Sequence, residues 1–203
     1  MSFQGILDGP SGSTPMKSEE IANLLASTIT SREELNAAEQ ANIIKATIWM
    51  GSKQISAKKL LKIETLKSLH RRMFADVWKW AGKFRSIETN IGVDSWKVQE
   101  ELQVLCQNVL IQISDTNSSR WTNDEIAIRF HHRLVSIHPF VNGNGRHARL
   151  AANHLVHCLG EEPFTWGREN LEEEGQTRRR YLNSLKDADE SYDFEKLLKF
   201  ARD

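Results

Sequence analysis

The sequence predicts an all-α fold: one helical domain with a small β-hairpin. Apolar residues recur at helical spacing through most of the chain, and capping signatures precede several of these stretches. A strand-like pattern occurs only between residues 84 and 96. The chain has 203 residues, 39% of them hydrophobic, which is enough for one well-buried core.

The first half of the chain contains three expected helices. Residues 1–17 are rich in glycine and proline and are expected to form a loose arm, followed by a short helix over 18–26. Thr30-Ser31 followed by Glu33-Glu34 gives capping-box spacing, so a helix should begin there and run to about Met50, with Gly51 as its stop. Thr65 is expected to cap a third helix that ends near residues 78–82.

The second half begins with the hairpin and then returns to helical periods. Turn-forming residues lie among β-branched and aromatic ones from Phe84 to Trp96. A helix is expected over 102–113, and Thr122 with Glu125 has the spacing of a second capping box. Further helices are expected from residue 149 to the glycine at 160, over 170–186, and from 193 onward.

A glycine-rich loop at residues 138–149, HPFVNGNGRHAR, carries the chemistry. Gly143 and Gly145 allow close approach of the backbone to a ligand, and a helix start that follows such a loop attracts anions. Arg146 and Arg149 are three residues apart, so both guanidinium groups can bind phosphate from one side of a helix. His138 stands at the mouth of this loop and can move a proton near neutral pH. A base beside a phosphate-binding loop indicates transfer from a nucleotide to a hydroxyl.

This loop resembles the signature of the Fic (Fido) family, His-Pro-Phe-x-(Asp/Glu)-Gly-Asn-Gly-Arg-x-x-Arg, and departs from it only at Asn142. Residues 69–85 resemble the helix and Trp-Ala-Gly turn that precede the flap of these proteins, and residues 181–189 resemble their closing helices. The resemblance covers about residues 30–200 and is greatest to the mobile mystery protein B group. It implies a Fido fold over residues 18–203, with a core at about 60–200.

The resemblance implies a nucleotidyltransferase that moves AMP from ATP to a Ser, Thr or Tyr hydroxyl of a target protein. His138 would be the general base. Gly143, Asn144 and Gly145 would hold the α- and β-phosphates, with the Asn144 side chain as an added donor. Arg146 would bind the β-phosphate region and Arg149 the γ-phosphate.

Asn142 stands where the family usually has the carboxylate that binds Mg²⁺. An amide oxygen can ligate Mg²⁺ but carries no formal charge, so a weakened metal site is expected. Three alternatives stay open: a slower transferase, a Fido phosphotransferase or other reaction, and a nucleotide-binding regulatory module of the toxin-antitoxin kind that has lost catalysis.

Two further elements follow from the resemblance. The hairpin would be a flap on which an extended target segment docks, with Ile87, Gly92, Val93 and Trp96 as its docking residues. Glu39, on the first long helix, is the candidate for self-inhibition, a role in which a glutamate pairs with the second motif arginine. The pattern around Glu39 is poorly kept, since Leu35 lies four residues before it.

Composition limits the partners and the location. The net charge is zero, so no overall field favours nucleic acid or an anionic membrane. Two cysteines and the lack of a leader or a long apolar run lead us to expect a cytoplasmic protein with free thiols. The seven histidines form no zinc pattern. The resemblance adds a small helix-turn-helix protein as an expected partner; the target is open, and so is a homodimer.

Overall fold

The computed structural model describes residues 22–25, 29–114, 121–168, 171 and 175–203. The arm predicted at 1–17 lies outside these residues, as does most of the helix predicted over 18–26. The part of that helix that is described, residues 22–25, is not helical. It forms a turn and an isolated antiparallel bridge between Leu24 and Trp78, so the helix prediction is wrong there.

The first helices confirm one cap and correct two others. Helix α3 (Arg32–Ser52) begins with the predicted capping box of Ser31 and Glu34. It continues through Gly51, whose backbone stays helical, so glycine does not stop it. A short helix, α4 (Ala57–Leu60), was not predicted. Helix α5 (Ile63–Phe74) starts two residues before Thr65, because the chain enters it from the extended Lys62 rather than through a threonine cap.

The remaining helices follow the predicted order. Thr122 and Glu125 form the second predicted capping box, which confirms the start of α7. The elements after α5 are η1 (Ser95–Lys97), α6 (Val98–Ser114), α7 (Asn123–Ile137), α8 (Asn144–Cys158), η2 (Trp166–Arg168), α9 (Gln176–Ser191) and α10 (Glu195–Arg202).

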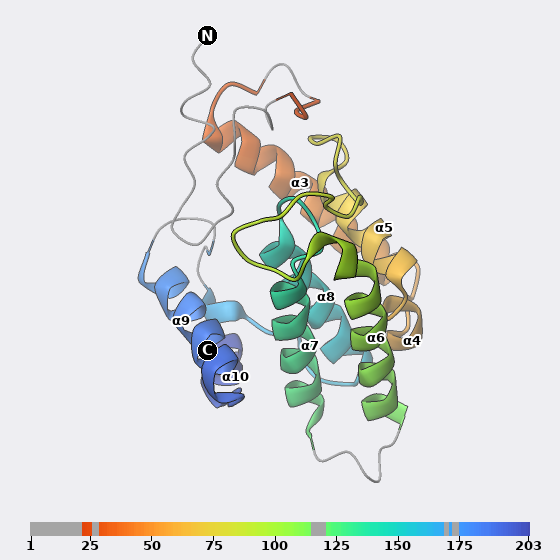
Figure 1. Cartoon of the computed structure of the whole chain (residues 1–203), viewed down its shortest axis with the longest axis vertical. Helices are drawn as coiled ribbons and strands as arrows, with labels where there is room; N and C mark the ends of the chain where they lie inside the picture. Colours follow the sequence, from red (N-terminus) through yellow and green to blue (C-terminus); the bar gives the residue numbers. More distant parts are fainter. Residues whose placement is uncertain (1–21, 26–28, 115–120, 169–170, 172–174) are drawn as a thin grey trace.

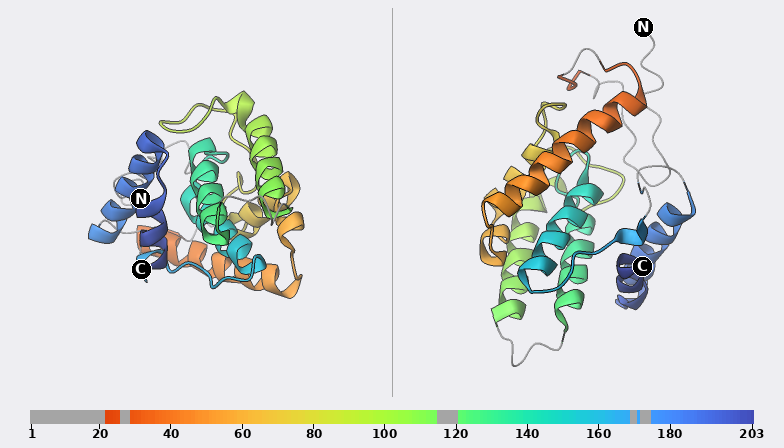
Figure 2. Two further views of the ribbon diagram at one scale, coloured as in Figure 1. Left: turned by 90° about the horizontal axis from the view of Figure 1, so that it is seen from below. Right: turned by 180° about the vertical axis from the view of Figure 1, so that it is seen from behind.

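Helix α7 is central to the bundle (Figure 1). It packs against α6 on one side and α8 on the other, while α3 and α5 pack against each other. Helices α9 and α10 form a pair beside α7, and the views in Figure 2 show α3 crossing the far side of the bundle. The loop between α7 and α8 is therefore the turn of the central helical hairpin.

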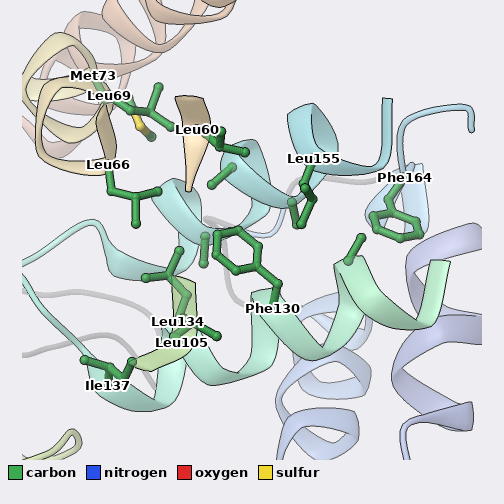
Figure 3. Close-up of a cluster of buried hydrophobic side chains, with 14 of the residues drawn as sticks. Leu60, Leu66, Leu69, Met73, Leu105, Phe130, Leu134, Ile137, Leu155 and Phe164 are labelled. Atoms are coloured by element: carbon green, nitrogen blue, oxygen red, sulfur yellow. The ribbon is translucent and has the colours of Figure 1, made fainter. Parts of the chain in front are cut away.

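The core lies where α5, α6, α7 and α8 meet, and Figure 3 shows its side chains in contact across these helices. Phe130 and Leu134 of α7 are fully buried, as are Leu66 and Leu69 of α5 and Leu155 of α8. Large apolar side chains that lose all contact with water each contribute about 1.5–3 kcal/mol. This packing fixes the ends of α7 and α8, between which the motif lies.

The predicted hairpin is wrong as a pair of strands. Residues 85–94 form an irregular loop, and the part of the chain that the structure describes holds only isolated bridges, one of them between Phe84 and Phe140. The loop carbonyls bind the side chain of Arg85 instead of a partner strand. No described helix is both long enough and apolar enough to cross a membrane.

Candidate functional site

His138 follows the last residue of α7 and turns the chain out of the helix. Its backbone is left-handed (φ 53°, ψ 60°), and its carbonyl accepts a hydrogen bond from Arg85 Nε at 2.7 Å. Residues other than glycine rarely adopt this conformation. Where they do, the residue often lies at a functional site, and the surrounding structure holds it in place. His138 is 5% exposed. The core helix and Arg85 together fix its position.

Burial keeps the His138 imidazole neutral. Loss of water around the ring, and then the positive charge of Arg85, lower its pKa to about 4, while a hydrogen bond with the Val135 backbone acts in the opposite direction. A neutral imidazole has a lone pair that can accept a proton. At neutral pH His138 is therefore in the state that a general base needs.

The motif loop leads directly into the N-terminus of α8. Gly143 has a positive φ of 76°, and a Cβ built there would lie 2.5 Å from the ring of Phe74. Only glycine fits this position. Gly143 is the N-cap of α8, and no side chain caps that helix end. The N–H groups and partial positive charge of a helix start attract anions, so the loop fits the phosphates of a nucleotide.

The side chain of Asn144 stabilises the motif loop through hydrogen bonds to its backbone. Its Oδ1 accepts from the Phe140 N–H at 2.9 Å, and its Nδ2 donates to the Phe140 carbonyl at 2.8 Å. The side chain is buried, so both of its polar ends are used within the protein. The expectation that the Asn144 side chain also donates to phosphate stays a prediction, since Nδ2 carries a second N–H. In this structure Asn144 shapes the loop.

Asn142 is also engaged by the loop itself. Its Oδ1 accepts from the Gly143 N–H at 2.6 Å. This amide oxygen is the atom that would approach Mg²⁺, and among the described residues no group of three or more His, Cys, Asp and Glu could hold a metal ion. Mg²⁺ prefers carboxylate and phosphate oxygens. The residues present therefore do not fit a metal site of the protein's own.

His70, which the sequence reasoning missed, ties the loop to the Trp-Ala-Gly turn. Its Nδ1 accepts from the Gly82 N–H at 3.0 Å, and its Nε2 lies 3.0 Å from the Asn142 carbonyl. Because Gly82 can only donate, the proton must be on Nε2. Burial, followed by the charge of His147, lowers the pKa of His70 well below its usual range, so this neutral tautomer persists. The His70 ring also stacks on the Phe140 ring, with 3.6 Å between the ring centroids.

The side chains of the two motif arginines contact different residues. Arg146 donates to Glu39 Oε2 at 2.5 Å and lies over the Phe74 ring. Arg149 lies over Tyr181 of α9, with its guanidinium near the backbone of Gly145. The expectation that both bind phosphate stays a prediction, and in this structure Arg146 is paired with Glu39.

Glu39 is held from two sides. Besides Arg146, the Trp78 indole N–H donates to its Oε1 at 2.6 Å, and the glutamate is 4% exposed. The partner is the first motif arginine, not the second, which corrects the pairing expected from the family. Trp78 was interpreted as core alone; its indole also positions this carboxylate. A tryptophan beside a buried acid carries no periodic signal in the sequence.

The predicted docking residues lie on the 85–94 loop or directly after it. The side chain of Ile87 is 49% exposed and that of Trp96 is 74% exposed. Gly92 has a φ of 117°, and a Cβ there would lie 2.8 Å from the Cβ of His138. Val93 N–H donates to the Ile137 carbonyl at 3.4 Å. The loop is therefore in contact with His138 and presents apolar side chains to solvent.

Comparison with known proteins agrees with this geometry. Residues 60–156 match the profile of the Fic/DOC family. The protein adenylyltransferase Fic of Drosophila virilis is 32% identical over 159 residues, which are 76% of this chain and 31% of that protein. The chain thus spans 31% of the length of this curated relative.

Two solved Fic domains from Bartonella share the fold. The N-terminal domain of the Bep8 protein from Bartonella sp. 1-1C aligns with a TM-score of 0.66 and 19% identity, over 87% of this chain and 88% of that one. The N-terminal domain of a Bep effector protein from Bartonella quintana, solved with bound ADP, aligns with a TM-score of 0.66 and 17% identity, over 95% of this chain and 91% of that one. The helical bundle described above is the Fic fold.

Proposed function

Because the chain belongs to the Fic/DOC family, we propose that it is a nucleotidyltransferase that moves AMP from ATP to a Ser, Thr or Tyr hydroxyl of a protein. One observation carries the proposal: a buried, neutral His138 precedes an uncapped helix N-terminus by a single tight loop. The relative from Drosophila virilis is named a protein adenylyltransferase, and a domain of the same fold was solved with ADP. Both support nucleotide as the donor.

In the proposed reaction, the Gly143–Gly145 backbone and the N-terminus of α8 bind the phosphates. His138 takes the proton of the acceptor hydroxyl while its oxygen attacks the α-phosphorus. The bond from the α-phosphorus to the bridging oxygen of the β-phosphate breaks, and pyrophosphate leaves. Such a base contributes about 10²–10⁴-fold to rate. Arg149, whose guanidinium lies near Gly145, would bind the outer phosphates.

The structure described is a restrained form of this enzyme in our proposal. The carboxylate of Glu39, on α3, forms an ion pair with the Arg146 guanidinium. A nucleotide that binds this guanidinium must therefore displace the carboxylate. Removal of Glu39 should therefore increase both ATP binding and transfer. The restraint acts through the first motif arginine, so the γ-phosphate position beside Arg149 is not blocked by this contact.

A nucleotide-binding module without transfer is the second candidate, and Asn142 favours it. Its side-chain oxygen is uncharged and already accepts from Gly143 N–H, so the protein supplies little to a metal-nucleotide complex. In this case ATP would bind and raise the melting temperature without modifying any protein.

One experiment separates the two candidates. The purified protein is incubated with ATP and Mg²⁺ or Mn²⁺, alone and with a cell lysate, and modified proteins are found by mass spectrometry. An AMP adduct that disappears in His138→Ala but persists in the matched surface variant His157→Ala supports transfer. ATP-dependent thermal stabilisation without any adduct supports the binding module.

A further inference from the structure

Arg85 is a buried cation that connects His138 to the loop before α6. Its side chain is fully buried, and its guanidinium donates to three backbone carbonyls: Nε to His138 at 2.7 Å, Nη1 to Ile87 at 3.1 Å, and Nη2 to Val93. Its own N–H donates to the Pro139 carbonyl at 3.0 Å. One residue thus binds both ends of the 86–94 loop and the backbone of the base.

The loop has little else to hold it in place. Within the described residues it has no strand partner, and its backbone is joined to α7 by the hydrogen bond from Val93 N–H to the Ile137 carbonyl. A Cβ at Gly92 would lie 2.8 Å from both Arg85 Nη2 and His138 Cβ. The loop therefore packs directly against the guanidinium and the base. In a hairpin, main-chain bonds between strands would do this work.

The placement is unusual for a structural arginine. Burial of a cation is unfavourable unless charged or polar partners compensate. The carboxylate nearest Arg85 is Glu88, 3.5 Å from Nη1, and its side chain is 65% exposed. The compensation thus comes mainly from carbonyls of the loop and of His138. A well-packed apolar residue could fill the space but could not join these three carbonyls.

We propose that Arg85 is the positioning residue of this site: its buried guanidinium fastens the 86–94 loop to the His138 carbonyl, so that the base and the surface for the acceptor segment keep one fixed relative position. Arg85 touches no substrate atom in this role. The link to an acceptor rests on the proposed transferase function, whereas the link between loop and base does not.

The same charge acts on the base. Besides burial, which lowers the pKa of the His138 ring most, Arg85 from the loop side lowers it further and the Val135 backbone of α7 raises it. Glu88 approaches the guanidinium rather than the ring, and its backbone-facing oxygen accepts from Ser95 N–H. A nearby cation disfavours protonation of an imidazole. Removal of the positive charge at residue 85 should therefore make His138 easier to protonate.

Two variants separate the effect of the Arg85 charge from the effect of its hydrogen bonds to the loop and to His138. Arg85→Gln removes the charge and most of the donors, while Arg85→Lys keeps the charge but cannot span three carbonyls. Arg133→Gln is the control, since Arg133 pairs with Glu101 at the surface of α7. The readouts are the NMR titration of the His138 ring and hydrogen exchange of the 86–94 amides, neither of which needs activity.

We expect the 86–94 amides to exchange at least about tenfold faster in both variants, with no change in Arg133→Gln. The pKa of His138 should rise by about one unit in Arg85→Gln and stay unchanged in Arg85→Lys. Wild-type exchange in Arg85→Lys would overturn the proposal, and this variant decides the matter if Arg85→Gln does not fold.

Transfer kinetics give an independent arm. For Arg85→Lys we expect the KM for the acceptor to rise about tenfold while ATP affinity is unchanged, because the hydrogen bonds of Arg85 go to His138, Pro139 and the 86–94 loop rather than to Gly143–Gly145. An unchanged acceptor KM would overturn the positioning role. If the wild-type protein transfers nothing, the proposed function fails, and the exchange and titration results still test the link between loop and base.

Discussion

Glu39→Gln tests the restraint on Arg146 with the smallest change in shape. The glutamine keeps an oxygen to accept from the Trp78 indole but loses the negative charge that holds the guanidinium. Arg146 then stays beside the motif loop without a competing partner from α3. ATP should bind more tightly, because its phosphates no longer have to displace a carboxylate.

The magnitude follows from the burial of the pair. The side chains of Arg146 and Glu39 are 16% and 5% exposed, so solvent screens their contact little. A hydrogen bond to a charged group contributes about 1.5–3 kcal/mol. If ATP must break a contact of about 2 kcal/mol, its removal should lower the Kd about thirtyfold, since 1.4 kcal/mol is a factor of ten. The unliganded protein should lose about 2 kcal/mol of unfolding free energy.

Isothermal titration with ATP measures the affinity, and chemical denaturation measures the stability. Glu33→Gln is the matched control, because it makes the same change on an exposed position of α3. We expect it to leave both quantities unchanged. An ATP affinity of Glu39→Gln within twofold of wild type would refute the reasoning, because the contact would then not compete with nucleotide.

Three other predictions concern the loop and the histidines. Asn142→Asp should improve the Mg²⁺ dependence of ATP binding about tenfold, seen by titration of Mg²⁺ at fixed ATP; an equal gain in the surface variant Asn183→Asp would contradict it. Asn144→Ala leaves both backbone groups of Phe140 without their partner, and denaturation should show a loss of about 3 kcal/mol, against almost none for Asn183→Ala. The pKa values of His138 and His147 are lowered to about 4 in the fold from an ordinary value of 6.5, so the unfolded chain takes up protons first as pH falls. Stability present above pH 6.5 should decrease toward pH 4, by about 2 kcal/mol per histidine at pH 5, and unchanged denaturation midpoints between pH 7.5 and 5 would contradict this.

Much of the fold was predictable because its signals are local. The capping boxes at Ser31 and Thr122 depend on residues three apart, and both helices begin where those pairs predict. The apolar face of α7 also follows from periodicity alone, and it delivers the chain to His138. The motif loop was recognisable from glycine spacing, since Gly143 takes the positive φ that such a loop requires.

Long-range contacts were not predictable in this way. The pairing of Glu39 with Arg146 joins residues 107 positions apart. It involves the first motif arginine, although the family pattern predicted the second. The predicted hairpin failed because β-branched residues around turn formers fit an irregular loop equally well once a buried Arg85 binds its carbonyls. His70 carries no sign of its role, since a histidine on a helix face gives no indication of what lies opposite.

The most direct test of AMP transfer by His138 uses ATP labelled either at the α-phosphate or at the γ-phosphate. The enzyme is the Glu39→Gln variant, in which Arg146 is released. The inactive control combines Glu39→Gln with His138→Ala. We expect protein-bound label from the α position only, and none from the double variant. Label from the γ position, or α label that persists without His138, would contradict this expectation.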